Sequence, residues 1–174
     1  MNLLEAMQKR HSIRKYEQEP IPEEKLNMVL QAGLLSASSR GRRPWELIVI
    51  QKRETLEKMS QCRAGAANML SGAGAAIVVV ADEKRTDVWI EDCSIVMANM
   101  HLMADSLGVG SCWIQGRLRE AADGSTTEEY LGRLLGIPEN YRLEAMLSLG
   151  VPAESKAVTA LEELDMSKIH FEKF

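Results

Sequence analysis

The chain has 174 residues, of which 45% are hydrophobic and 26% charged, with 25 acidic residues against 21 basic ones. This length suits one domain with a sizeable core, and the composition is ordinary for a soluble globular protein. No apolar run approaches the roughly 20 residues of a membrane span, and the N-terminus lacks the basic start of a signal peptide. The net charge of −4 argues against a general nucleic-acid-binding face. Three cysteines without metal or CxxC spacing fit a reducing compartment, so we expect a cytoplasmic protein. Together with the charge and the lack of long apolar runs, this predicts no membrane and no nucleic-acid partner.

The pattern of apolar residues predicts helices and strands along the whole chain. We expect helices over 2–10, 22–36, 54–60, 88–107 and 127–135, and strands over 47–50, 75–81, 109–114 and 143–149. The run 75–81 is apolar at every position, which indicates a central strand covered on both faces. Ser125 and Glu128 have the spacing of a capping box before the last helix, and Gly108 is expected to close the longest one.

Two features of the sequence predict a homodimer. The helix 88–107 carries apolar residues around nearly its whole circumference, and a helix of that kind is buried on all sides. A chain of this size can hardly enclose it alone, so we infer that a second subunit covers it. The C-terminal extension, residues 153–174, is polar but ends in Ile169, Phe171 and Phe174. Such a tail is either frayed or wrapped around a partner, and its aromatic residues favour wrapping.

Two clusters of basic residues stand out against the acidic balance of the chain. The turn 9–16 places Arg10, Ser12 and Arg14 where they can converge on one anion, provided that the backbone is not helical there. The loop 36–45 contains three more arginines. A guanidinium group binds phosphate through two hydrogen bonds, and a hydroxyl group can complete the site. Solvated surface charge is the simpler alternative for both clusters.

Other motifs are absent or have a simpler explanation. The segment 71–76 is rich in glycine, but it precedes a strand, whereas a dinucleotide-binding loop follows one. The three histidines have no acidic companions at ligand spacing, so we predict no metal site. Cys112 lies in an apolar strand and is expected to be a small buried side chain rather than a reactive thiol.

Five segments of the chain resemble motifs of the nitroreductase family of FMN-dependent oxidoreductases. They are Arg10–Tyr16, Ser36–Trp45, Asp92–Ile114, Leu135–Pro138 and Leu149–Pro152. The segments follow the family's order and separations, so the resemblance covers essentially the whole chain, residues 1–174, as a single domain. It implies an α+β nitroreductase-like fold, in which helices flank a central and mostly antiparallel sheet. It also implies an obligate homodimer that holds two FMN molecules at the subunit interface.

The sequence departs from the family pattern in three places. Gly41, Arg42 and Arg43 stand where many relatives have asparagine or glutamine before Pro-Trp, which adds positive charge near the mouth of the site. Ala37 stands where proline is usual. Lys156 is only approximately at the position of the basic residue with which relatives clamp the phosphate.

The cofactor-binding residues that the resemblance implies come from four segments. They are Arg10, His11, Ser12 and Arg14; Ser38, Ser39 and Arg40; Trp113, Ile114 and Gln115; and Lys156. The first group and Lys156 would hold the phosphate and the ribityl chain, with Arg14 at the phosphate or at the pyrimidine edge. The second group would contact the isoalloxazine from the other subunit. The third would line the cofactor, largely through backbone groups.

The resemblance implies an FMN-dependent NAD(P)H oxidoreductase that reduces nitroaromatics, quinones or a similar electron-poor acceptor by ping-pong hydride transfer. FMN carries the chemistry, so no catalytic side chain is expected to be indispensable. Arg14 or Arg40 would stabilise negative charge on the reduced flavin. One alternative is a flavin-binding or sensing protein with little NAD(P)H-dependent turnover, because the short chain lacks the extra helices of larger relatives. Another is an interaction protein whose arginines bind anionic partners without any flavin.

Overall fold

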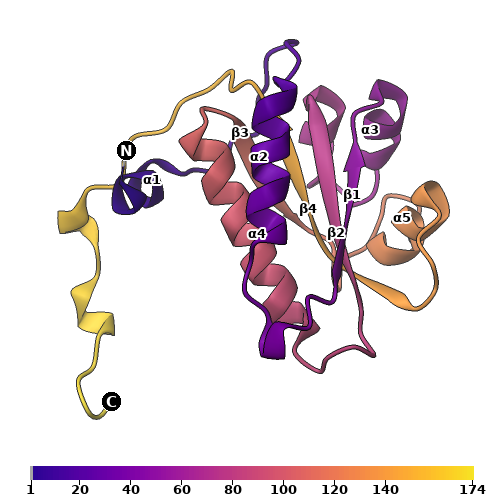
Figure 1. Cartoon of the computed structure of the whole chain (residues 1–174). Helices are drawn as coiled ribbons and strands as arrows, with labels where there is room; N and C mark the ends of the chain where they lie inside the picture. Colours follow the sequence, from indigo (N-terminus) through magenta and orange to yellow (C-terminus); the bar gives the residue numbers. More distant parts are fainter. Residues whose placement is uncertain (1) are drawn as a thin grey trace.

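The computed structural model describes residues 2–174, and in it helices cover both faces of a four-stranded sheet (Figure 1). The helices are α1 (Leu3–Lys9), α2 (Glu23–Leu34), α3 (Arg53–Met59), α4 (Trp89–Ser106) and α5 (Thr127–Leu135). The strands are β1 (Trp45–Ile50), β2 (Ala75–Asp82), β3 (Gly110–Gln115) and β4 (Tyr141–Gly150). Short 3-10 turns are η1 (Ser39–Gly41), η2 (Asn68–Gly72), η3 (Leu161–Glu163) and η4 (Met166–Lys168). The predicted α+β class is confirmed, and the predicted helices and strands are present with ends shifted by up to two residues.

The sheet has the strand order β1-β2-β4-β3, and all of its pairings are antiparallel. β2 is paired on both sides and is buried from Ala75 to Ala81, which confirms the predicted central strand. The register between β2 and β4 shifts between Val79 and Val80, which pair with Ala145 and Leu143. Glu144 is therefore left without a direct partner on β2, as in a β-bulge.

Alternate residues of β2 point into two separate apolar cores. One face packs against α2 and α4, with Val29, Val96 and Met100 among the buried residues. The other face packs against α3, η2 and α5, where Met59 and Leu131 are fully buried. Figure 1 shows α2 and α4 on one side of the sheet and α3 and α5 on the other. This alternation is what a strand apolar at every position requires, because its side chains point to both faces.

The long helix α4 buries only one side within a single chain. Cys93, Val96 and Met97 are fully buried against the sheet, whereas Ile95 is 40% exposed and Ala98 is also exposed. The chain itself thus leaves an apolar part of α4 uncovered. Gly108 follows the helix with a φ of 71°, a left-handed conformation that glycine adopts without strain, as predicted for the end of this helix.

The capping box of α5 lies one residue later than predicted. Thr126 Oγ1 accepts from the Glu129 backbone N–H at 3.1 Å, and the Glu129 carboxylate accepts from the Thr126 N–H at 2.9 Å. The expected pair Ser125 and Glu128 is therefore wrong. Glu128 instead accepts from the Leu143 backbone N–H at 2.7 Å, which ties α5 to β4. Ser125 and Thr126 each have a glutamate three residues later, so both pairs have the correct spacing.

The segment that follows α1, residues 12–17, is attached to the edge of the sheet. Ser12 makes a parallel bridge with Ser111 at the start of β3, and Tyr16 makes an antiparallel bridge with Pro152 after β4. The Tyr16 hydroxyl is buried and hydrogen-bonds to Ser148 Oγ at 2.8 Å. These contacts hold the basic turn against one end of β3 and β4.

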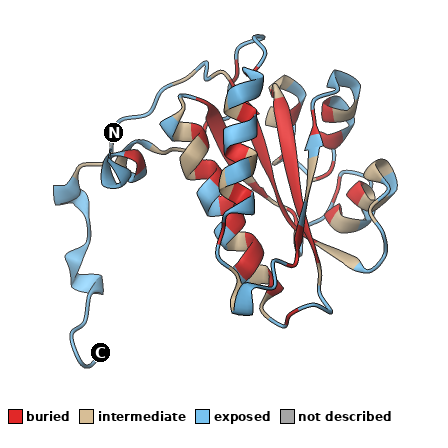
Figure 2. Cartoon of the chain, in the orientation of Figure 1, coloured by how far each residue is buried: buried red, intermediate tan, exposed pale blue. Residues whose placement is uncertain are grey.

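The C-terminal extension lies away from the sheet, beside α1 (Figure 1). Its residues are mostly exposed (Figure 2), with Phe171 85% and Phe174 107% exposed. It is attached to α1 through a pair of contacts: Thr159 N–H donates to the Gln8 carbonyl at 3.1 Å, and the Gln8 amide donates to the Thr159 carbonyl at 3.0 Å. The tail thus leaves its two phenylalanine side chains uncovered by the rest of the described chain.

We predict that Gly150→Ala destabilises the fold by about 1–3 kcal/mol, the usual cost of overpacking a core. A Cβ at position 150 would lie 2.6 Å from Cδ1 of the Tyr16 ring, which its buried hydroxyl holds in place. The matched control is Gly132→Ala in α5, where a Cβ meets no atom within 4 Å. That change should stabilise by about 0.5–1 kcal/mol. Urea unfolding of both variants measures the difference, and equal midpoints would contradict the packing argument.

Candidate functional site

Arg10 lies where α1 ends and points toward α4. It is the C-cap residue of α1, with an extended backbone, so the helix stops at the place where the basic cluster begins. Its Nη1 lies 3.0 Å from Nε2 of His101, and Nδ1 of His101 lies 2.5 Å from Ser111 Oγ. His101 is 7% exposed. Burial, and then the Arg10 charge, lower the pKa of His101 to about 4, so the imidazole is neutral at pH 7.

His11 and Lys156 line the same small cleft, of about 160 Å³, beside the start of β3. The His11 Nδ1–H donates to the Lys9 carbonyl at 2.6 Å, which orients the ring at the cleft. Glu154 also lines this cleft and accepts from the Arg14 backbone N–H at 2.6 Å, a contact that lowers the pKa of its carboxyl group. Lys156 follows β4 in the chain, and the structure brings it beside the turn that the sequence predicts as a phosphate site.

Among the described residues, the basic side chains of this turn form no ion pair of 4.0 Å or less, although the carboxyl groups of Asp105 and Glu154 line the adjoining cleft. Within residues 2–174, the basic side chains in ion pairs of 4.0 Å or less are Lys58, Lys168, Arg133 and Arg142. All of these lie outside the turn 9–16 and the loop 36–45. An acidic chain that leaves a cluster of basic groups without ion pairs offers a site for an external anion.

The loop 36–45 is fastened to the opposite end of α4. The Ser39 backbone N–H donates to the buried carboxylate of Asp92 at 2.8 Å, and Ser38 Oγ accepts from the Arg43 N–H at 2.9 Å. Arg40 and Arg43 both have positive φ, of 52° and 44°, and their side chains are exposed. These contacts give the loop a fixed shape with its arginines at the surface.

The two basic clusters do not meet within one chain. Asp92 and His101, which mark the clusters on α4, are nine residues apart. At a rise of 1.5 Å per residue this is about 14 Å along the helix axis. The structure therefore brings His11 and Lys156 to one cleft beside the turn of Arg10 and Ser12, but leaves Ser38, Ser39 and Arg40 at the other end of α4.

The predicted residues of β3 alternate between the two faces of the sheet. Trp113 and Gln115 share the α4 face, and Trp113 Nε1 donates to Gln115 Oε1 at 2.9 Å. Ile114 is 1% exposed and lies in the opposite core, so only its backbone groups face the sheet edge. Arg14 is exposed, and its side chain reaches back only to the Ser12 carbonyl, at 3.5 Å.

Two buried carboxyl groups near these residues were not predicted from the sequence. Glu144 on β4 is 3% exposed, and its Oε2 has no hydrogen-bond partner among the described residues; burial raises its pKa. Oδ2 of Asp92 is likewise buried without a partner. A glutamate inside the apolar run 143–149 was the available signal for Glu144, whereas nothing in the local sequence marks Asp92.

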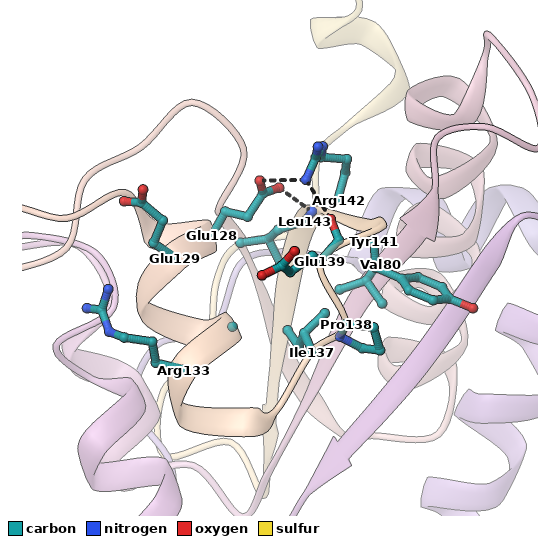
Figure 3. Close-up of a pocket in the computed structure, with 11 residues that line it drawn as sticks. Val80, Glu128, Glu129, Arg133, Ile137, Pro138, Glu139, Tyr141, Arg142 and Leu143 are labelled. Carbon is teal, nitrogen blue, oxygen red and sulfur yellow. Dashed lines mark hydrogen bonds and ion pairs between the residues drawn. The ribbon is translucent and has the colours of Figure 1, made fainter.

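A separate cleft of about 450 Å³ lies between α5 and the start of β4 (Figure 3). It is lined by Glu128 and Arg142, which lie 3.6 Å apart at Oε1 and Nη1, and by Ile137, Pro138 and Tyr141. None of the predicted cofactor-binding residues lines it. Because the Arg142 and Glu128 side chains are partly exposed, their pairing contributes little to stability.

The three cysteine thiols offer no nucleophile to the basic turn or to the cleft beside it. Cys62, Cys93 and Cys112 are all buried and free. Burial raises the pKa of Cys62 and Cys93 to about 12 and raises the pKa of Cys112 as well. The expectation that Cys112 is a small buried side chain is therefore confirmed.

Comparison with known proteins places the chain in a family. The sequence profile of the nitroreductase family matches residues 7–65 and 59–151. A protein of Archaeoglobus fulgidus, provisionally named an NADH dehydrogenase/NAD(P)H nitroreductase, is 38% identical over 98% of this chain and 98% of its own length. A Methanothermobacter thermautotrophicus protein with the same name is 37% identical, over 100% of this chain and 88% of its own.

Solved structures agree with that match. A protein of Clostridium difficile described as an FMN-dependent nitroreductase has a TM-score of 0.95 and 42% identity, over 98% of this chain and 99% of its own. The fold is thus the α+β architecture of the nitroreductases. The chain belongs to the nitroreductase family, an oxidoreductase family, as the resemblance of its five segments predicts. Across residues 2–174, each helix is too short or too polar to span a bilayer.

We predict that His101 makes stability depend on pH between about 4 and 6.5. Its pKa is lowered in the folded chain, so in this window the unfolded chain binds more protons and acidification favours unfolding. The folded state should lose up to roughly 3 kcal/mol as the pH falls through the window. Urea unfolding at several pH values measures the slope, with His101→Gln as the control in which this part of the slope disappears. A variant with the slope of the unaltered chain would contradict the assignment.

Proposed function

We propose that the chain is an FMN-dependent NAD(P)H oxidoreductase that reduces nitroaromatics, quinones or a similar electron-poor acceptor in ping-pong order. The observation that carries the proposal is the basic turn of Arg10, His11 and Ser12 beside β3, whose His11 lines one cleft with Lys156. FMN supplies hydride transfer when it is bound. Support comes from the Clostridium difficile neighbour, whose description names FMN, and from a Desulfovibrio desulfuricans structure described as a complex with FMN, at 23% identity and a TM-score of 0.75.

The residues of the turn fit a phosphate group. The Arg10 guanidinium has five N–H donors and uses one of them on His101, so four remain for an anion. Ser12 has its backbone fixed by the bridge to Ser111, and its hydroxyl lies beside the Cys112 thiol, while Lys156 adds a positive charge at the adjoining cleft. A phosphate dianion held this way would receive charge-assisted hydrogen bonds from groups that are already in place.

We also propose that the active unit is a homodimer. The uncovered side of α4 and the exposed aromatic tail support this assembly. Two α4 helices packed side by side in opposite directions would bring the loop 38–40 of one chain toward the Arg10 turn of the other. This would place Ser38, Ser39 and Arg40 at the isoalloxazine of the partner's cofactor, beside Trp113 and Gln115. Arg40 or Arg14 would then stabilise negative charge on the reduced flavin.

The size of the relatives and the unpaired cysteines support two further proposals. Residues 1–174 act as one domain, because the match with the Clostridium difficile structure covers 98% of this chain and 99% of that one. The protein works in the reducing cytosol, because the cysteines are free.

An anaerobic absorbance spectrum, recorded before and after addition of NADH or NADPH, tests the proposed activity. We expect flavin absorption near about 450 nm that bleaches on reduction. Bands that persist would indicate the alternative, a flavin-binding or sensing protein with little turnover. A protein that stays colourless after incubation with FMN would overturn the proposal and favour an arginine-rich surface for anionic partners.

We predict that Arg10→Ala weakens FMN binding by about 10- to 100-fold, the value of a charge-assisted hydrogen bond in a partly buried site. The control is Arg53→Ala, which removes an exposed guanidinium that donates to the Ser71 carbonyl at α3. Fluorescence titration with FMN measures both dissociation constants, and circular dichroism checks that both variants fold. Unchanged FMN affinity in Arg10→Ala would remove the phosphate assignment.

We predict that removing the residues after Val158 weakens the dimer by at least tenfold in its dissociation constant, because the aromatic tail would lose its contacts with the second chain. This truncation retains Glu154 and Lys156. A second variant, with Phe171→Ala and Phe174→Ala, separates the aromatic contacts from the length of the tail. Analytical ultracentrifugation gives the dissociation constants. If both variants form a dimer as stable as that of the unaltered chain, the tail is frayed.

A further inference from the structure

Arg10, His101 and Ser111 form a hydrogen-bonded chain whose direction follows from their chemistry. An arginine side chain keeps its protons, so Nη1 of Arg10 is the donor and Nε2 of His101 is the acceptor at 3.0 Å. A neutral imidazole carries one proton, which must then lie on Nδ1. Nδ1 donates it to Ser111 Oγ at 2.5 Å. The imidazole is thus fixed in one tautomer by a partner on each side.

His101 is a neutral partner of Arg10, at a position where an acidic residue would be the more usual partner of an arginine. The charged and titratable groups around it are Arg10, at the end of α1, and Asp105, one turn further along α4. Asp105 feels the charges of Arg10 and His11 and meets the His11 backbone, but it forms no ion pair of 4.0 Å or less within residues 2–174. A carboxylate in place of the imidazole would orient the guanidinium but would cancel its charge and compete with an incoming anion. A neutral acceptor orients it and leaves the charge available.

Ser111 connects this chain to the rest of the proposed phosphate site. Its hydroxyl meets His101, and its backbone carbonyl accepts from the Ile13 N–H at 2.9 Å beside the bridge to Ser12. One residue at the start of β3 therefore sets both the imidazole that holds Arg10 and the backbone that carries the Ser12 hydroxyl. The two phosphate-binding groups are placed relative to each other through a strand rather than through a flexible loop.

We propose that His101 is a positioning residue, which holds the Arg10 guanidinium in the orientation that binds the phosphate group of the cofactor. The inference rests on the proposed function, because it requires Arg10 to bind that phosphate. It goes further in assigning a role to a buried histidine of α4 that is not itself in the binding cleft. The lowered pKa of His101 supports it, since the imidazole stays an acceptor throughout the range in which the protein would work.

Riboflavin provides the discriminating probe, because it has the ring and ribityl chain of FMN but no phosphate. Fluorescence titrations with FMN and with riboflavin are carried out on the unaltered full chain and on His101→Leu, His101→Gln, Arg10→Ala and the double variant Arg10→Ala with His101→Leu. We expect His101→Leu to weaken FMN binding by about tenfold. It should change riboflavin binding by less than about twofold, because no ligand group there meets Arg10.

Two further comparisons separate positioning from a general structural effect. His101→Gln keeps an acceptor near the place of Nε2, so it should restore most of the FMN affinity that leucine loses. In the Arg10→Ala background, His101→Leu should cause no further loss, because its effect runs through the guanidinium. Equal losses for FMN and riboflavin, or a full loss in the Arg10→Ala background, would overturn the inference while leaving the proposed function intact.

A measurement on the unaltered protein keeps the test independent of how the variants fold. Nitrogen NMR of the imidazole rings at pH 7 should show His101 with a protonated Nδ1 and an unprotonated Nε2, its signal being the one that disappears in His101→Gln. A protonated Nε2 cannot accept from Arg10 and would overturn the inference. If the unaltered chain binds neither FMN nor riboflavin, the proposed function fails, and this role of His101 fails with it.

Discussion

The two-sided burial of β2 and β4 is the constraint on which the rest of the structure depends. A strand that is apolar at every position has to be covered on both faces, because its side chains alternate between them. This requirement places α2 and α4 on one face and α3 and α5 on the other, and it moves polar chemistry to the margins of the sheet. The basic turn accordingly lies against the ends of β3 and β4, where backbone groups are free to pair with the segment 12–17.

α4 has two roles that follow from its position on this sheet. One side completes a core of Cys93, Val96 and Met97, and the chain leaves the opposite side partly uncovered. Its two ends carry different groups: Asp92 fastens the loop 36–45, and His101 meets the basic turn. A single helix thus sets the spacing between the two basic clusters, which is why the proposed function needs a second copy of the chain to bring them to one ligand.

Local sequence patterns were sufficient for the elements and for the central strand. The apolar run 75–81 and the amphipathic pattern of 127–135 each have one physical solution, and the structure has it. The cap of α5 was wrong by one residue, because Ser125 and Thr126 precede Glu128 and Glu129 at the same spacing and only the position of Leu143 decides between them. Local patterns carry no information on such tertiary partners.

The residues of the candidate site likewise divide into those that sequence patterns predict and those that depend on tertiary contacts. Arg10 and Ser12 were predicted from the local spacing of the basic turn, whereas Lys156 was predicted only through motif order, because it is far too distant along the chain for a spacing argument. His101 was read as one of three scattered histidines, and its contact with Arg10 depends on the crossing of α1 and α4. Glu144 and Asp92 were missed for a related reason: a buried carboxyl group without a partner is visible only when its surroundings are known.

The route of the chain through the Arg10 turn has a consequence for biosynthesis. Arg10 and Ser12 leave the ribosome early, His101 and Ser111 follow after β1 and β2, and Lys156 comes only after β4. The turn has no edge to pair with until β3 exists, and Tyr16 has no Ser148 to hold it until β4 exists. A nascent chain therefore cannot form these contacts, on which the proposed anion site around Arg10 depends, before nearly all of it has been translated.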